Sequence, residues 1–337
     1  MRRAARRAAA GALLAALGIA APAWPADQEV SPEATPGPLA RMAAAARQAL
    51  GEAGLERREV AAAGGRLVIW RGGAGPHLVL LHGSGQQAGA WAAVAPGLID
   101  AFTVHVLDLP GHGDSAPAEG PLPMARVVAG VEAYLLSLDG PAILVGNSMG
   151  AWLATLEAHR HPGKVSRAVL VNGGALLNVP APGLTLTPAD REGARRLMAA
   201  LRDPASPPLP DEVLDDLVLR SRAGPTGRML QDLPGLMAHL LDGRLGEVEV
   251  PVDILWGASD RLIPLDYARR MEGQLTRARL TVLEGCGHIP PAECPQAFLA
   301  TLRTVLAQSP PAAPEEAPGA EEPGARTAEP GEGEPAP

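Results

Sequence analysis

The sequence contains few cysteines, few aromatic residues and a single lysine. Its 337 residues include 2 Cys, and aromatic residues make up 3% of the chain. Lys164 is the only lysine, so almost every cation is an arginine. Two cysteines and the lack of a long repeat exclude fibrous and disulfide-dense proteins. The length suits one larger domain or two small ones, and it is ample to bury a core.

Charge is unevenly distributed along the chain. The net charge is −8, with four arginines and no acid in residues 1–26 and seven glutamates against one arginine in residues 309–337. These ends carry +4 and −6, which leaves −6 for residues 27–308. A mildly acidic body without a basic patch argues against nucleic acid as a partner.

The N-terminus has the pattern of a secretory signal over residues 1–26. A positive segment (Arg2, Arg3, Arg6, Arg7) precedes the apolar run 8–21, and small residues at Ala21 and Ala23 suit cleavage near Ala23. The run is shorter than the ~20 residues of a membrane span. We therefore expect an exported protein, periplasmic or secreted, without an integral membrane segment after signal removal. An uncleaved anchor or a wrong start codon are the alternatives.

Two further terminal segments stand outside the main domain. Residues 27–55 predict a linker followed by a helix at 39–50, where Ala, Leu and Met recur at helical spacing. Residues 309–337 consist of Pro, Glu, Ala and Gly without apolar periodicity, which predicts a disordered acidic tail. The main domain then spans residues 56–308.

In this domain, short apolar runs alternate with helical patterns. The expected strands are 59–63, 67–70, 77–81, 103–107, 142–145, 168–171, 252–256 and 280–283. The expected helices are 88–98, 124–138, 148–159, 266–275 and 296–306. Several runs are continuously apolar, as in strands covered on both faces. The pattern predicts an α/β fold, with a mostly parallel sheet and helices on both sides.

Residues 173–249 interrupt this alternation. They hold no convincing strand, and helices are expected after Thr187-Pro188, at 211–221 and at 226–241. About 75 residues is far beyond an ordinary connection. We interpret the stretch as a helical insertion over the sheet, whereas ordinary surface helices are the alternative.

The strongest motif is G-N-S-M-G at residues 146–150. It follows an apolar strand and opens a helix, which is the context that G-x-S-x-G requires. The two glycines relieve clashes in the sharp turn and Ser148 stands at its apex. Ser148 is therefore the candidate nucleophile.

A serine nucleophile needs a base and an acid. His288 follows the last expected strand, and Asp260 follows the strand at 252–256. The order Ser148, Asp260, His288 is the one expected for this arrangement. Asp253 lies inside a strand and Asp266 begins a helix, so both are weaker candidates for the acid.

A glycine-rich turn, H-G-S-G, follows the strand at 77–81. It can direct a backbone N–H of Ser84 or Gly85 at a developing oxyanion, and Met149 supplies the second N–H. The spacing does not decide between Ser84 and Gly85. We expect His82 to hold this loop by hydrogen bonds rather than to act as a base.

The motifs together resemble the α/β-hydrolase family over residues 56–308. They are L-H-G-S-G at 81–85, D-L-P-G-H-G-D-S at 108–115, the elbow at 146–150, G-A-S-D at 257–260 and G-H at 287–288. The resemblance implies an eight-stranded sheet with a helical cap, about 173–249, inserted before the acid-bearing strand. No metal-ligand spacing and no dinucleotide motif are present in the sequence, so no cofactor is expected.

The expected reaction is acyl transfer from a small-molecule substrate to water. A serine nucleophile argues against the dehalogenases and epoxide hydrolases that share this pattern. Similarity to C–C-bond hydrolases of meta-cleavage products is partial, because Gln86-Gln87, Ala151 and Ile289 depart from that group. We therefore favour a small or medium carboxylic ester, with C–C cleavage and a non-catalytic binding protein as alternatives. Few aromatics argue against an aromatic acyl pocket, although Trp91 and Trp152 fall near the site in sequence.

The two cysteines flank His288 in the sequence. Cys286 and Cys294 are eight residues apart. In an exported protein an even pair is typical of a disulfide, here one that would restrain the loop of the base. Two free buried thiols are the alternative, because the sequence does not give the distance between them.

Overall fold

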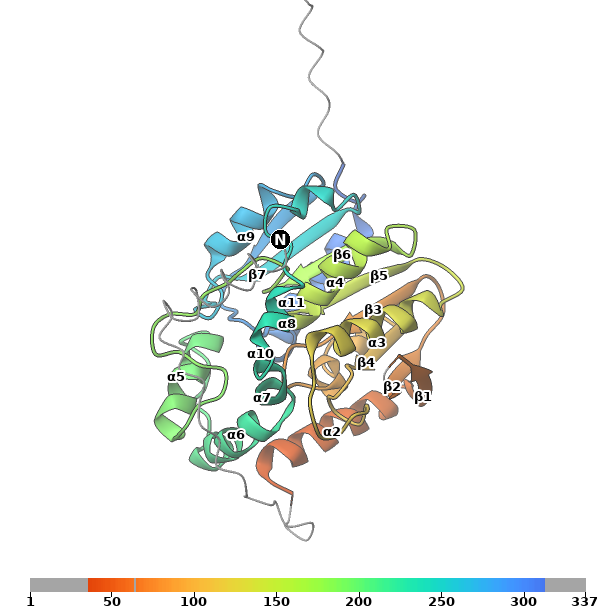
Figure 1. Cartoon of the computed structure of the whole chain (residues 1–337). Coiled ribbons are helices and arrows are strands. Elements are labelled where there is room, and N and C mark those ends of the chain that lie inside the picture. The colour runs from red at the N-terminus through yellow and green to blue at the C-terminus, as the bar shows by residue number, and fades with distance from the viewer. Residues whose placement is uncertain (1–35, 64, 313–337) are drawn as a thin grey trace, which may run out of the picture.

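A computed structural model describes residues 36–63 and 65–312 and shows one eight-stranded sheet (Figure 1). The predicted signal peptide, most of the linker and the tail from residue 313 lie outside the described residues. The strands are β1 (Glu56–Ala62), β2 (Gly65–Gly72), β3 (His77–Leu81), β4 (Thr103–Asp108), β5 (Ala142–Asn147), β6 (Val165–Val171), β7 (Val252–Gly257) and β8 (Ala278–Leu283). Their order is β1-β2-β4-β3-β5-β6-β7-β8, and only the β1–β2 and β2–β4 pairs are antiparallel. The predicted mostly parallel sheet is confirmed.

Both faces of the sheet are covered, because successive strand residues point to opposite sides. In β3, Val79 and Leu81 pack into one core and Leu78 and Leu80 into the other. The first core lies under α3 (Met124–Leu136), α4 (Met149–Arg160) and α9 (Leu265–Glu272). The second lies under α2 (Pro38–Glu52), the 3-10 turn η1 (Ala88–Trp91) and α11 (Pro295–Ala307). No helix within the described ranges is long and apolar enough to cross a bilayer.

The segment between β6 and β7 contains helices and loops and, in the described chain, no strand. The helices are α5 (Arg191–Leu201), α6 (Asp211–Ala223), α7 (Pro225–Leu230), α8 (Leu233–Met237) and the 3-10 turn η3 (Leu245–Glu247). We call residues 173–249 the insert. Figure 1 shows α5 and α6 together at one side of the molecule, away from the strands.

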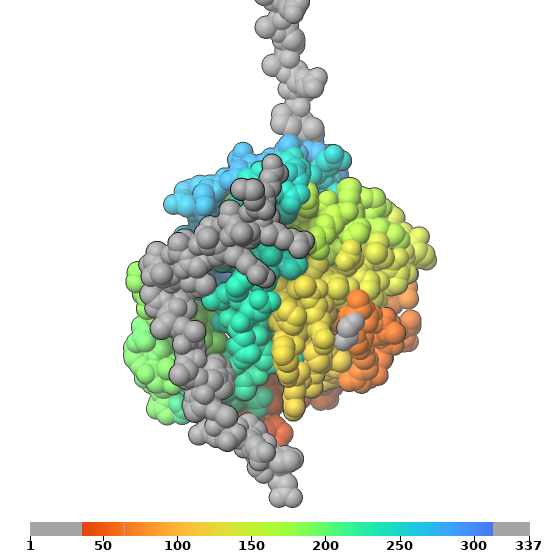
Figure 2. Space-filling model, in the orientation of Figure 1, coloured from red at the N-terminus to blue at the C-terminus, as the bar shows by residue number. Residues whose placement is uncertain are grey.

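Arg228 anchors the insert to the main domain. This arginine of α7 is buried, and its guanidinium donates hydrogen bonds to carbonyls of the loop after β4: those of Gly111, Pro117, Ala118, Glu119 and Gly120. The teal part of the insert borders the yellow residues of this region in the space-filling view (Figure 2). Burial lowers the pKa of Arg228, and the five carbonyl acceptors compensate its charge.

Three helix predictions need correction. Residues 88–98 form η1 and a second 3-10 turn, η2 (Ala95–Gly97), because Pro96 and two glycines disfavour a continuous helix. The helix expected at 226–241 divides into α7 and α8, where Asp232 caps a new helix with Pro234 in its first turn. The first helix of the insert begins after Asp190 rather than Thr187, because the Asp190 carboxylate accepts the Gly193 amide at 2.7 Å.

Candidate active site

Ser148 lies in the sharp turn between β5 and α4. Its backbone has φ 54° and ψ −116°, a strained conformation for a residue with a side chain. Glycines permit the turn: a Cβ atom at Gly146 would overlap the Gly150 carbonyl, and one at Gly150 would overlap the Leu81 carbonyl. Ser148 is half-buried, so the turn presents its hydroxyl at the carboxyl end of the sheet.

Asp260 and His288 lie in the loops after β7 and β8, and their side chains are hydrogen-bonded. His288 Nδ1 is 2.7 Å from Asp260 Oδ2, and the two side chains are 4% and 0% exposed. Because an ionised carboxylate only accepts, Nδ1 carries the proton and Nε2 is left as the proton acceptor. Within the described residues the Ser148 hydroxyl makes no hydrogen bond to this ring, and such bonds often tighten only with substrate.

The Asp260 carboxylate is held by three groups besides the imidazole. Its Oδ1 accepts the amides of Leu262 and Ile263, both at 2.9 Å. Its Oδ2 accepts Asn172 Nδ2 at 2.8 Å. Asn172 is fully buried with φ 48°, and its Oδ1 accepts the Gly257 amide at 3.0 Å. The sequence analysis missed Asn172, for which the only signal is an Asn-Gly directly after a buried strand.

The loop after β3 lies beside the serine. A Cβ atom at Gly83 would be 3.3 Å from Ser148 Cβ. The Gly83 amide donates to Gln86 Oε1 at 2.9 Å and is occupied. In residues 36–63 and 65–312, no hydrogen bond is donated by the amides of the predicted oxyanion donors, Ser84, Gly85 and Met149. These amides are therefore available to a ligand, and the hydrogen bonds do not decide whether Ser84 or Gly85 pairs with Met149.

Two histidines near the site have structural hydrogen bonds. His82 Nδ1 donates to the Gly83 carbonyl at 2.8 Å, and its Nε2 accepts the Leu109 amide at 3.1 Å. Burial lowers the pKa of His82 to about 3 and that of His112 to about 4. Both rings are therefore neutral at physiological pH, and His82 fixes the loop that carries the candidate oxyanion donors.

The competing aspartates have other partners. Asp253, inside β7, forms ion pairs with Arg167 and Arg279, each at 2.6 Å. Asp266 is in the first turn of α9, where it is exposed and pairs with Arg269 at 2.9 Å. Neither contacts His288, which leaves Asp260 as the carboxylate of the site.

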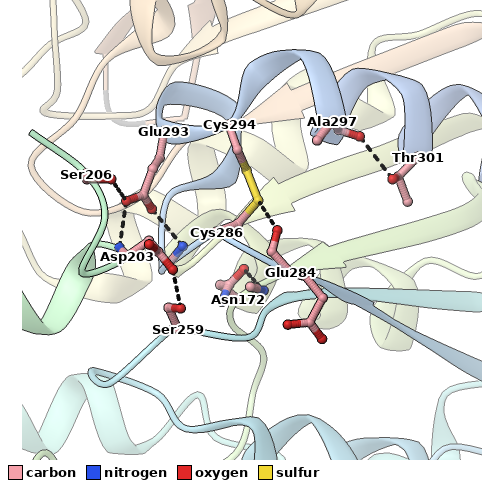
Figure 3. Close-up of a disulfide and its surroundings, with 12 residues drawn as sticks. Asn172, Asp203, Ser206, Ser259, Glu284, Cys286, Glu293, Cys294, Ala297 and Thr301 are labelled. Atoms are coloured by element: carbon pink, nitrogen blue, oxygen red, sulfur yellow. Dashed lines mark hydrogen bonds between the residues drawn. A yellow bond between two sulfur atoms is a disulfide. The ribbon is translucent and has the colours of Figure 1, made fainter.

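Cys286 and Cys294 form a disulfide with a Cα–Cα distance of 5.9 Å (Figure 3). The bridge joins the loop after β8 to the start of α11. His288 lies between the two half-cystines in the sequence. The bridge therefore closes the loop that carries the candidate base.

Trp91 and Trp152, which fall near the motifs in sequence, both have packing or hydrogen-bonding roles in the structure. Trp91 is 1% exposed and packs against Phe298, with ring centroids 6.1 Å apart. Trp152 donates from Nε1 to the His239 carbonyl at 2.9 Å, which ties α4 to the insert. Two surface hollows, of about 300 Å³ and about 370 Å³, lie elsewhere and are not lined by Ser148, Asp260 or His288. Within the described ranges no group of three or more His, Cys, Asp and Glu residues is arranged to hold a metal ion.

The mostly parallel eight-stranded sheet with helices is consistent with the α/β-hydrolase fold. The model of the alpha/beta hydrolase family matches residues 78–301, and the chain belongs to this family. It is a hydrolase of the α/β class.

The relatives are named for different substrates. A 2-hydroxy-6-oxononadienedioate/2-hydroxy-6-oxononatrienedioate hydrolase of Burkholderia vietnamiensis is 34% identical over 240 residues, 63% of this chain and 80% of that one. A pimeloyl-[acyl-carrier protein] methyl ester esterase of Methylococcus capsulatus is 33% identical over 244 residues, 66% of this chain and 92% of that one. The crystal structure of a bacterial membrane phospholipase A is 27% identical with a TM-score of 0.67, covering 80% of this chain and 93% of that one.

Proposed function

We propose that the protein is a serine hydrolase that cleaves a small or medium carboxylic ester through an acyl-enzyme. Ser148 is the nucleophile, His288 the general base and acid, and Asp260 the acid that orients the imidazole. The observation that carries the proposal is the buried 2.7 Å Asp260–His288 hydrogen bond, in loops at the same end of the sheet as the Ser148 elbow.

The chemistry follows from these positions. Ser148 Oγ attacks the ester carbonyl carbon while His288 Nε2 takes the hydroxyl proton. The negative charge that develops on the carbonyl oxygen is stabilised by the amide of Met149 and that of Ser84 or Gly85. His288 gives this proton to the leaving alcohol as the ester C–O bond breaks. Water then attacks the acyl carbon while His288 Nε2 takes its proton, and His288 returns that proton to Ser148 Oγ as the carboxylic acid is released.

The direct test is p-nitrophenyl ester hydrolysis by the wild type and by Ser148→Ala. We expect the substitution to lower kcat by about 10³-fold or more. A fluorophosphonate probe should label the wild type and not the variant. Retained hydrolysis in Ser148→Ala would refute the assignment, and a wild type that is neither labelled nor active on any substrate would favour the non-catalytic alternative.

C–C-bond cleavage is the second candidate. It is supported by the 34% identical Burkholderia relative, whereas the 33% identical Methylococcus relative supports ester cleavage. The departures at Gln86-Gln87, Ala151 and Ile289 favour the ester. Rates on esters of increasing acyl length, compared with those on a ring-fission diketone, decide between the two. Turnover of the diketone alone would reject the ester proposal.

We also propose that the protein is exported, with cleavage near Ala23. The disulfide supports this, because such bridges persist in oxidising compartments. Cell fractionation followed by N-terminal sequencing tests it. A chain that begins at Met1 and stays in the cytosol would contradict export.

A further inference from the structure

The loop closed by the disulfide contains Gly287, whose backbone conformation must be restrained if the neighbouring base is to keep its position. Gly287 stands between the half-cystine Cys286 and the base His288. Its lack of a side chain is required, because a Cβ atom there would overlap the Leu201 carbonyl of the insert. Glycine has the greatest backbone freedom of any residue. The disulfide fixes the ends of this loop, and the backbone of His288 is held by its amide, which donates to the Leu201 carbonyl at 2.7 Å, and by its carbonyl, which accepts Asn147 Nδ2 at 2.9 Å. The amide of Gly287, directly before the base, needs a partner of its own.

Glu293 supplies that contact. It is the last residue of the short helix α10 (Pro290–Glu293), next to Cys294. Its Oε2 accepts the Gly287 amide at 2.7 Å, so the side chain reaches back across the closed loop. Figure 3 shows this carboxylate between the loop and the insert.

The other oxygen of Glu293 binds the insert. Oε1 accepts the Asp203 amide at 2.6 Å and the Ser206 hydroxyl at 2.5 Å. Asp203 in turn accepts the hydroxyl of Ser259, which directly precedes Asp260, at 2.5 Å. One chain of hydrogen bonds thus runs from the loop of the base, through Glu293 and the insert, to the loop of the acid.

We propose that Glu293 is a positioning residue that sets the imidazole of His288 by clamping Gly287 to residues 203–206 of the insert. The carboxylate is well suited, because it accepts three donors at once and needs no proton of its own. Hydrogen bonds to a charged acceptor are stronger than neutral ones. The clamp rests on the proposed role of His288 as base.

The test compares Glu293→Gln with Glu284→Gln. The Gln side chain keeps one acceptor oxygen but presents an NH₂ group, so either Gly287 or the insert meets a donor instead of an acceptor. We expect Glu293→Gln to lower kcat on an ester about tenfold with KM changed less than about threefold. Glu284 follows β8, just before Cys286, is exposed and makes no side-chain hydrogen bond within the described chain, so Glu284→Gln should match the wild type.

A second readout separates positioning from simple loss of stability. The rate of fluorophosphonate labelling at Ser148 should fall by the same factor as kcat, at a temperature where thermal unfolding shows both variants folded. Equal kcat in the two variants, or a loss confined to KM, would overturn the proposal. If Glu293→Gln is poorly expressed, Glu293→Ala, which removes both acceptor oxygens, takes its place in the same assays, with the same loss of kcat expected. Failure of the serine mechanism itself would be seen separately, as an unlabelled wild type or an active Ser148→Ala.

Discussion

Two aspartate–histidine pairs lie at opposite ends of the sheet. At the carboxyl end, Asp260 and His288 are 2.7 Å apart with side chains 0% and 4% exposed. At the amino end, where β3 begins, His77 Nε2 is 2.6 Å from Asp139, whose side chain is 93% exposed. The two hydrogen bonds have almost the same length, so the difference between the pairs is in their surroundings.

The surroundings decide what each pair can do. An exposed carboxylate is solvated and screened, so Asp139 stabilises a charged imidazole only weakly. The other ring nitrogen of His77, Nδ1, is hydrogen-bonded to His105 Nε2 at 3.0 Å, and His105 Nδ1 is hydrogen-bonded to the Tyr134 hydroxyl at 2.8 Å. Burial lowers the pKa of His105 to about 3 and raises that of Tyr134 to about 12, so neither exchanges a proton near neutral pH. An Asp–His pair therefore becomes a candidate base only with a buried, well-supported carboxylate.

The largest effect is expected from exchanging the carboxylates for amides. Asp260→Asn should lower kcat by about 10³- to 10⁴-fold, because an amide can force the wrong tautomer on His288. Asp139→Asn, the same change at the amino end, should leave kcat within about twofold, since exposed pairs contribute little. Steady-state ester hydrolysis checks both. Comparable losses in the two variants would show that burial does not distinguish the pairs.

Much of the fold is predictable because its signals are local. Short β-type runs, several of them continuously apolar, identify all eight strands, and the elbow motif places Ser148 between a strand and a helix. The errors occur where one residue overrides a periodic pattern. Pro234 lies in the first turn of a new helix, although the apolar spacing of the preceding helix continues past it. Asp190 is the N-cap of the first helix of the insert, although Thr187-Pro188 also has the pattern of a helix start.

The site is less predictable because its supports come from distant segments. Asn172 reaches Asp260 across 88 positions, and Glu293 reaches Asp203 across 90. No periodicity links such residues, because the contacts exist only once the insert returns to the sheet. The disulfide likewise could not be predicted firmly, because the number of residues between two cysteines does not give the distance between their Cα atoms.

A buried carboxylate whose oxygens accept no hydrogen bond in the described chain offers a contrast with Asp260. Glu157 in α4 is fully buried, and neither of its oxygens has a hydrogen-bond partner among the described residues. Burial, and next the charge of Glu132, raise its pKa to about 8 from 4.5. Between these values the folded state holds a proton that the unfolded state has released, so the free energy of unfolding falls as pH rises.

Glu157→Gln should remove this pH dependence. We expect the variant to gain roughly 3–5 kcal/mol over the wild type at pH 8, and little below pH 4.5. Urea unfolding across this range measures the difference. Glu52→Gln on the exposed side of α2 is the control and should show no such trend. A gain that does not grow between pH 4.5 and 8 would contradict a protonated Glu157. The other ionisable side chains near Glu157 are His161, with Nε2 3.9 Å from Glu157 Oε2, and Arg160.

Asn172→Ala probes the support of the proposed catalytic carboxylate, Asp260. Removing the 2.8 Å bond to Oδ2 frees Asp260 to rotate, and we expect kcat to fall about tenfold, as for loss of one hydrogen bond to a charged group. Asn178→Ala is the matched control, because Asn178 donates to the Leu262 carbonyl and does not touch the carboxylate. If both variants lose the same activity, general loosening of the loop explains the effect and support of Asp260 does not.

The smallest effect on kcat is expected at the amino end. Tyr134→Phe leaves the buried Nδ1 of His105 without its partner, which should lower the free energy of unfolding by about 1–3 kcal/mol. It should not change kcat, because the His77–His105–Tyr134 chain begins at the amino end of β3, whereas Ser148 lies at the carboxyl end of the sheet. Urea unfolding and ester hydrolysis on the same preparation measure both quantities. Lower activity in a variant that is still folded at the assay temperature would mean that the two ends of the sheet are coupled, and the contrast between the two pairs would then fail.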